Sequence, residues 1–221
     1  MPDSTLETIK AANADLIRKI LDLAIVVAPY SAAVPTSFTS GASSTLQSLA
    51  TDYKPIGWTD KDDGATWSRD LDVSETTSHG SSEPTRRDVN SDVTGFQMTA
   101  QQTSKLVLEL TQNIDLTGVT PTATTGEIGW NKPVAPATRY YRLIAIGRDG
   151  AGTDTIYVIK VLPRAMISDI GDETWSDTDA LTYPLTWTAT PDPTLGYAVR
   201  TVLAGPGVKS RLVSMGFPAA T

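Results

Sequence analysis

Few side chains in this 221-residue sequence could do chemistry, and their spacing does not assemble a catalytic site. The chain has no cysteine and a single histidine, His79, which lies in the polar stretch 78–82. One imidazole excludes a multi-histidine metal site, and a Ser-His-Asp triad would need a base held in a flexible tract. We therefore expect His79 to be an exposed loop residue.

Two segments resemble ligand-binding loops and fail on their spacing. An acidic turn runs from Asp60 to Gly64, but the twelfth position of an EF-hand counted from Asp60 is Leu71 rather than an acid. The glycine-rich segment 147–152 lacks the Gly-Lys-Ser/Thr ending of a phosphate-binding loop. We interpret both segments as turns between strands.

Paired carboxylates and tryptophans also give no enzyme. Asp70 and Asp72 are two residues apart, which places both on one face of a strand, whereas a glycosidase needs two carboxylates that face each other across a sugar. The five tryptophans are spread along the chain, as core and interface residues usually are. We predict a protein that is not an enzyme and has no catalytic, cofactor-binding or metal-binding residue.

The charge distribution narrows the class of partner. The net charge is −7, and residues 60–92 alone carry nine acids and four bases. This balance argues against a nucleic-acid binder that neutralises phosphates. The longest apolar run, residues 23–29, is too short to cross a bilayer, and the N-terminus lacks the basic start of a secretory signal. We expect a protein that is made in a cytoplasm and has no membrane partner.

The N-terminal part reads as an arm. Ser4 and Glu7 form a capping-box pattern, and apolar residues recur at helical spacing after them, which predicts a helix over residues 4–27. Residues 31–52 are small and polar and predict an irregular arm or linker, anchored by Leu46 and Leu49.

A folded body is expected to begin near Tyr53. Alternation over residues 66–73 predicts a strand with one dry face and one acidic face, and residues 93–103 predict a second strand. The stretch between them, residues 74–92, is Ser/Thr-rich and predicts a long polar loop, which in a compact domain usually has a function. Ser104 predicts the cap of a helix that continues to Asn113.

The C-terminal half predicts more strands. Residues 140–146 and 155–162 form the clearest hairpin, apolar at nearly every position and thus buried on both faces. Residues 116–136 read as a loop with a short strand around Ile128 and Trp130. Residues 183–190 alternate as a strand that Pro184 makes an edge strand or bulged, and residues 209–215 predict a last short strand.

These elements predict a mainly β fold. Its simplest architecture is an antiparallel β-sandwich or partly open barrel with one flanking α-helix, plus an N-terminal helical arm. The predicted division is an arm over residues 1–52, a β domain over 53–207 with its long loop at 74–92, and a tail over 208–221.

Several segments in this order resemble the major tail tube proteins of long-tailed phages, especially those that infect actinobacteria. The resemblance covers roughly residues 53–207 and lies in the order and spacing of the segments rather than in one sharp motif. The segments are Lys54-Pro55-Ile56-Gly57-Trp58, Asp62-Asp63-Gly64, Arg86-Arg87, Phe96-Gln97-Met98, Val161-Leu162-Pro163-Arg164-Ala165, Leu181-Thr182-Tyr183-Pro184-Leu185-Thr186-Trp187 and Pro191-Asp192-Pro193-Thr194-Leu195-Gly196. The helical arm is longer than a minimal subunit of this kind would need.

The resemblance implies a structural virion protein. Such subunits close into rings, usually of six, and the rings stack into the tail tube through which DNA is ejected into the host. The implied partners are further copies of the chain and other tail proteins, namely the tape measure, tail tip and terminator, while genomic DNA passes through the lumen without specific binding. Assembly would occur in the bacterial cytoplasm, and the product would be the tail of the virion.

Two sets of residues are expected to serve this function. Charged residues in and beside the polar loop are predicted to make contacts between stacked rings: Glu75, Glu83, Arg86, Arg87 and Asp88. Asp70 and Asp72 are predicted to face the lumen, where acids would repel DNA and let it slide. Alternatives remain: the tube of a contractile injection or type VI-like system, another tail component such as a terminator or tip, and a carbohydrate-binding β-sandwich.

Overall fold

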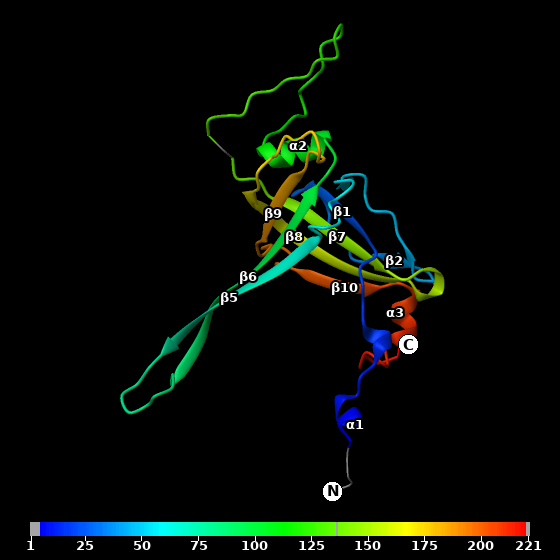
Figure 1. Cartoon of the computed structure of the whole chain (residues 1–221), viewed down its shortest axis with the longest axis vertical. Coiled ribbons are helices and arrows are strands. Elements are labelled where there is room, and N and C mark those ends of the chain that lie inside the picture. Colours follow the sequence, from blue (N-terminus) through cyan, green and yellow to red (C-terminus); the bar gives the residue numbers. More distant parts are fainter. Residues whose placement is uncertain (1–4, 136, 220–221) are drawn as a thin grey trace.

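The computed structural model describes residues 5–135 and 137–219 and is built on one large antiparallel sheet. Eight strands form this sheet in the order β4-β1-β7-β8-β9-β6-β5, with β10 paired to β8, and β2 pairs with β3 beside it (Figure 1). The predicted mainly β class with a flanking helix is confirmed. The strands are β1 (Asp22–Pro29), β2 (Thr39–Ser40), β3 (Thr45–Leu46), β4 (Lys54–Pro55), β5 (Ala65–Thr76), β6 (Arg86–Ala100), β7 (Tyr141–Asp149), β8 (Ile156–Ile170), β9 (Tyr183–Ala189) and β10 (Arg200–Ala204). The helices are α1 (Leu6–Lys10), α2 (Lys105–Gln112) and α3 (Pro206–Arg211), with 3-10 turns η1 (Ala14–Leu16) and η2 (Gly152–Asp154).

The sheet curls into a partly open barrel. The chain that follows β4 returns to the end of β6, where the carbonyl of Trp58 accepts from the N–H of Gln101 at 2.9 Å and the N–H of Asp60 donates to Thr99 at 2.8 Å. These bonds bring the two ends of the sheet order together. Helix α2 covers one side of the interior, with Val107 fully buried against the barrel core.

Helix α2 and the central hairpin form as the sequence predicts. The hydroxyl of Ser104 accepts from the N–H of Val107 at 3.3 Å and so caps the helix. Strands β7 and β8 are buried on both faces: Leu143 faces the barrel core with Trp187, while Ile144 faces a second core on the outside of the sheet. Residues 31–52 are predicted to be an arm or linker, and part of this stretch covers that outer face through the buried Phe38.

The predicted helix over residues 4–27 is wrong beyond its first turns. Helix α1 ends at Lys10, after which Ala11 adopts a left-handed conformation with φ of 44°. Residues 22–29 are the strand β1, which pairs with β4 and β7, because the β-branched run Ile25, Val26 and Val27 packs well in a sheet. The predicted cap Ser4 lies outside the described residues, and Thr5 caps α1 instead.

The predicted loop over residues 74–92 is mostly strand. Strand β5 continues to Thr76 and β6 begins at Arg86, and the two pair along their whole length, so that only residues 77–85 form a loop. This extension is polar on both faces and lacks the apolar alternation that reveals a half-buried strand. Ser and Thr residues predicted a loop here, but backbone pairing between the strands determines the structure.

Three smaller predictions are also wrong. Residues 209–215 do not form a strand, since α3 begins with Pro206 in its first turn and occupies part of this segment. Strand β9 is internal, between β8 and β6, although Pro184 predicts an edge or a bulge there; the bulge lies in β8, after Ile167. In residues 116–135, as the structure describes them, no strand forms around Trp130. Across the described ranges, no helix is long and apolar enough to cross a membrane.

Candidate assembly surfaces

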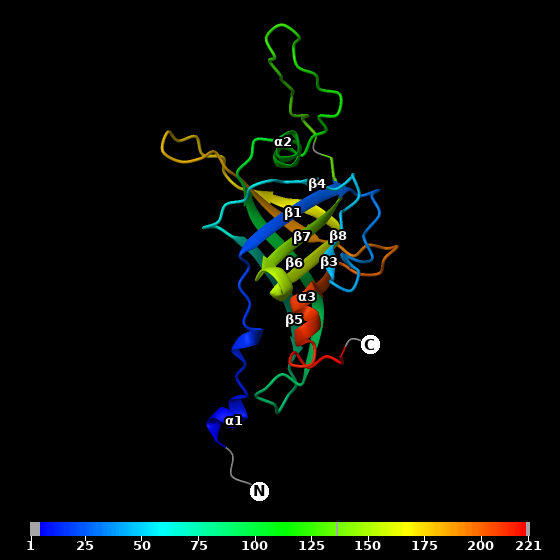
Figure 2. The same ribbon diagram turned by 90° about the vertical axis from the view of Figure 1, so that its right-hand side faces the viewer.

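The most exposed feature is the outer half of the β5–β6 hairpin, which we call the hairpin arm (residues 68–94). It projects away from the barrel in both views (Figures 1 and 2). None of its residues is buried, whereas Phe96, at its base, is fully buried and stacks on Trp67 with ring centroids 4.3 Å apart. The arm is therefore held by the core at one end and exposed to solvent on both faces.

One face of the arm, continuous with the side of Trp67, carries an apolar strip between two ion pairs. Near the base, Arg69 donates to Asp92 through two bonds of 2.7 and 2.6 Å, and this hydrogen bonding lowers the pKa of Asp92 below its ordinary value. Near the tip, Arg87 donates to Glu75 at 2.8 Å. The side chains between these pairs are exposed and apolar: Leu71, Val73 and Val89.

The opposite face of the arm is acidic. Asp70 and Asp72 lie on it together, as their spacing predicts, and Asp88 follows opposite Ser74. Arg86 donates to Asp88 at 2.7 and 2.9 Å, and the amide of Asn90 donates to Asp72 at 3.0 Å. A bulge at Asn90, opposite the step from Asp72 to Val73, irregularises the ladder here.

The predicted contact residues thus do not form one cluster. Glu75 and Arg87 lie on the apolar face, Arg86 and Asp88 on the acidic face, and Glu83 in the loop at the tip. Both ion pairs are exposed, and exposed pairs add little to the stability of a single subunit. Their charges are therefore available to a neighbouring molecule.

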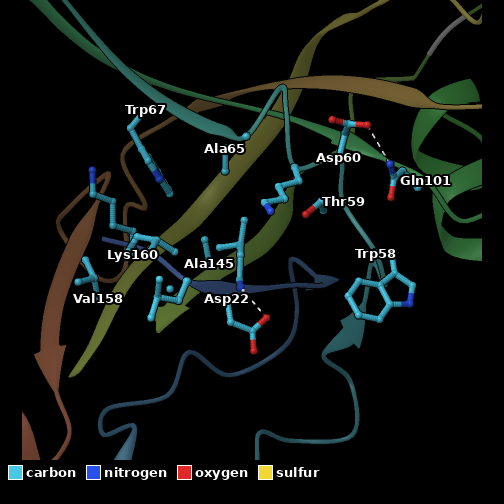
Figure 3. Close-up of a pocket in the computed structure, with 17 residues that line it drawn as sticks. Asp22, Trp58, Thr59, Asp60, Ala65, Trp67, Gln101, Ala145, Val158 and Lys160 are labelled. Carbon is cyan, nitrogen blue, oxygen red and sulfur yellow. Dashed lines mark hydrogen bonds between the residues drawn. The ribbon is translucent and has the colours of Figure 1, made fainter. Parts of the chain in front are cut away.

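A pocket of about 640 Å³ opens beside the base of the arm (Figure 3). Its walls include Leu23, Ala145 and Trp67, and the ammonium group of Lys160 lies 4.3 Å from the centroid of the Trp67 ring. Burial lowers the pKa of Lys160. Trp58, on the rim, is 73% exposed. This apolar pocket is not organised as a catalytic site, because its polar groups are engaged in local structure.

The acidic turn at Asp60 is one of these local structures. The Asp60 carboxylate accepts from the backbone N–H groups of Asp62 at 2.8 Å and Asp63 at 3.1 Å, and these bonds lower its pKa. The amide of Gln101 donates to its other oxygen at 2.8 Å. Within the described residues, no group of three or more histidine, aspartate or glutamate side chains is placed to hold a metal ion. His79 is exposed in the tip loop, as expected.

Sequence reasoning missed a buried ion pair between Arg142 of β7 and Asp192. Asp192 is 1% exposed, and Arg142 donates to it, to the carbonyl of Pro163 and to that of Ala32. Burial alone would raise the pKa of Asp192, but the bond from Arg142 and the N–H groups of Leu195 and Thr194 lower it to about 2. A Pro-Asp-Pro sequence predicts only a turn, so the partner of this acid is visible only in the fold.

Comparison with known proteins gives this architecture a family. Three solved structures share the fold only loosely. A sheath-tube complex of the extracellular contractile injection system PVC matches at 8% identity over 92% of this chain and 99% of that chain, with a TM-score of 0.46. The cap that terminates the tube of the anti-feeding prophage matches at 10% identity, 88% and 97% coverage and a TM-score of 0.41. An Hcp protein matches at 9% identity, 81% and 97% coverage and a TM-score of 0.32.

Family membership comes from the sequence. No curated protein matches the chain. The family model described as phage tail tube protein, however, matches residues 10–198, which is most of the sequence. The chain therefore belongs to the phage tail tube protein family, as a structural, non-enzymatic subunit that forms the tail tube.

Proposed function

We propose that this subunit builds its tube from closed hexameric rings, in the long flexible tail of a siphophage similar to those of actinobacteria. The observation that supports the proposal is the open outer edge of the sheet. Strand β5 is the last strand in the sheet order and leaves one edge unpaired along Ala65–Thr76. An exposed edge of this length is normally covered by another chain, and a head-to-tail contact that repeats by rotation closes a ring.

The hairpin arm is proposed to join one ring to the next. Its charged residues would exchange their exposed partners for partners on the neighbouring ring: Glu75, Glu83, Arg86, Arg87 and Asp88. The ladder of β5 and β6 supports this role because it makes the arm a rigid extension rather than a flexible loop. A rigid arm loses little conformational entropy when it binds.

Electron microscopy and native mass spectrometry of the purified protein test the ring proposal. We expect hollow tubes, and six copies of the 23.5 kDa chain in the smallest closed species. A ring of another number would contradict the hexamer, and single rings that never stack would indicate a terminator or tip component. A protein that stays monomeric under all assembly conditions would contradict the proposal as a whole.

Asp70 and Asp72 are proposed to face the lumen. DNA carries about one negative charge per 1.7 Å of its axis, so an acidic wall repels it whereas a basic wall retains it. Virions with Asp70→Lys and Asp72→Lys should form normal tails and release DNA at least severalfold more slowly after triggering. The matched control is Asp62→Lys with Asp63→Lys, two exposed acids outside the arm. Equal release rates in all three virions would refute the lumen assignment.

The remaining assignments follow from this role. The proposed partners are other copies, the tape measure, the tail tip and the terminator, with assembly in the host cytoplasm and DNA passing without specific binding. We retain a division into an arm (1–52), a tube domain (53–207) and a tail (208–221) as a prediction. The strand β1 would then be contributed to the domain from within the arm.

A further inference from the structure

The two ends of the molecule differ sharply in charge. At the end that carries α2, the connection from β8 to β9 includes residues 169–180, which we call the acidic loop (gold in Figure 2). It contains five acids and no base, and all its residues are exposed. Near its middle, Trp175 is 85% exposed, and its indole N–H donates to Glu173 at 2.7 Å. A large aromatic side chain is thus presented to solvent within a ring of negative charge.

The opposite end, where α3 and the N-terminal arm lie, holds a small apolar pocket (Figures 1 and 2). We call it the terminal pocket. Its volume is about 260 Å³, equal to that of about nine molecules of liquid water, which suffices for one indole side chain. Its lining comes from the arm, β8, β10 and the C-terminal segment, and includes Leu16, Ile156, Leu203, Val208 and Met215.

The surroundings of the terminal pocket are basic. Residues 205–219 contain Lys209 and Arg211 and no acid. Arg18 lines the pocket itself; its closest approach to Asp149 is 3.9 Å, and its Nη2 atom has no hydrogen-bond partner among residues 5–135 and 137–219. Lys10 and Lys19 add positive charge from the arm. The pocket therefore combines an apolar floor with unsatisfied positive charge.

We propose that the acidic loop of one subunit docks in the terminal pocket of a second copy, with Trp175 seated among the apolar side chains. The inference deepens the proposed stacking of rings and rests on it. The loop and the pocket carry opposite charge, and tryptophan buried in a pocket is the commonest kind of side chain to dominate an interface. Since the two surfaces lie at opposite ends of one chain, their contact does not close on itself and repeats without limit.

A second copy is the occupant that fits these surfaces. The subunit forms a tube, so every acidic loop is surrounded by further copies that each carry a terminal pocket. Trp58, the other highly exposed tryptophan, lies on the rim of its own 640 Å³ pocket, with Asp60 and Lys61 beside it, and has no such surplus of one charge. Charge therefore distinguishes Trp175 as the residue suited to the basic end.

Truncation of the aromatic side chain tests the contact. Trp175→Ala should raise the protein concentration needed for ring stacking by at least about tenfold, and Trp175→Phe should restore much of the loss. The melting temperature of the unassembled subunit should not change, because the indole is exposed. Stacking by Trp175→Ala at the wild-type concentration would overturn the proposal.

Disulfide trapping tests the geometry directly, because the natural chain has no cysteine. Thr174→Cys combined with Leu203→Cys should give a ladder of covalent multimers when assembled tubes are oxidised. Thr174→Cys alone can give dimers only, and Thr174→Cys with Ser81→Cys, at the tip of the arm, should give no ladder. Absence of the first ladder in intact tubes, or an equal ladder from the control pair, would overturn the docking while leaving stacking itself established. Failure of the wild-type protein to stack would instead contradict the proposed function.

Discussion

Replacing Arg86 and Arg87 by glutamate should leave the subunit folded and stop tube growth. In the single subunit, Arg87 is paired with Glu75 and Arg86 with Asp88, both on the exposed arm. Reversal places like charges at both positions, and like charges across an interface oppose association strongly. Because no residue of the arm is buried, the barrel core should be unaffected. We expect rings without tubes even at more than about ten times the wild-type assembly concentration.

Three measurements make this result decisive. Circular dichroism and thermal melting should show a native subunit, and electron microscopy should show isolated rings. Lys132→Glu, an exposed reversal in another loop, should assemble normally and controls for net charge. Since Arg87 and Arg86 occupy opposite faces, each single reversal also reports which face contacts the neighbour. Tubes of wild-type length from the double variant would remove the arm from the inter-ring contact.

Replacing Asp192 by alanine should destabilise the subunit more than any change on the arm. The substitution leaves the mostly buried guanidinium of Arg142 without its counterion and removes the bonds that hold the turn at Thr194 and Leu195. Breaking one half of a buried pair is costly, and we expect the melting temperature to fall by on the order of 10 °C. Arg142→Met combined with Asp192→Leu should fall less than Asp192→Ala, because no buried charge remains alone.

Asp192 also predicts a specific dependence of stability on pH. Its pKa in the folded chain is about 2, against an ordinary value of 3.8, so the charged form is favoured by folding. Its contribution is complete above about pH 4 and is lost as the pH falls towards 2. Asp192→Asn should lack this component, and its difference in melting temperature from wild type should shrink over that range. A constant difference from pH 5 to pH 2 would contradict the assignment.

The parts of the fold that could be predicted are those with a one-sided or two-sided apolar pattern. Strands β7, β8 and β9 each bury at least one face, and their residues show it; Ser104 marks the start of α2 by its type and position. Strand β1 was missed because Leu16, Ile17, Ile20 and Leu21 continue a helical spacing up to its first residue. The choice between helix and strand there is made by pairing with β7, a contact distant in sequence.

The assembly surfaces were harder to predict for a related reason. The arm is exposed on both faces, so the free subunit leaves no burial pattern in residues 74–92. Spacing placed Asp70 and Asp72 on one face correctly, but the bulge after Asp72 and the split of Arg86 from Arg87 depend on the register of two strands. The acidic loop and the terminal pocket lie far apart in the chain, and their complementarity appears only when the two ends of the molecule are compared.

The open edge of β5 has a further consequence for the time before assembly. A long unpaired strand would let free subunits stick together edge to edge as amorphous aggregate while they accumulate. The bulge at Asn90 twists the hairpin, and Asp70, Asp72 and Glu75 place charge along its edge strand, both of which natural sheets use against promiscuous pairing. A pool of such subunits would remain dispersed until a preformed ring offers the right partner. Tube formation should accordingly show a lag that short tube fragments, added as seeds, abolish.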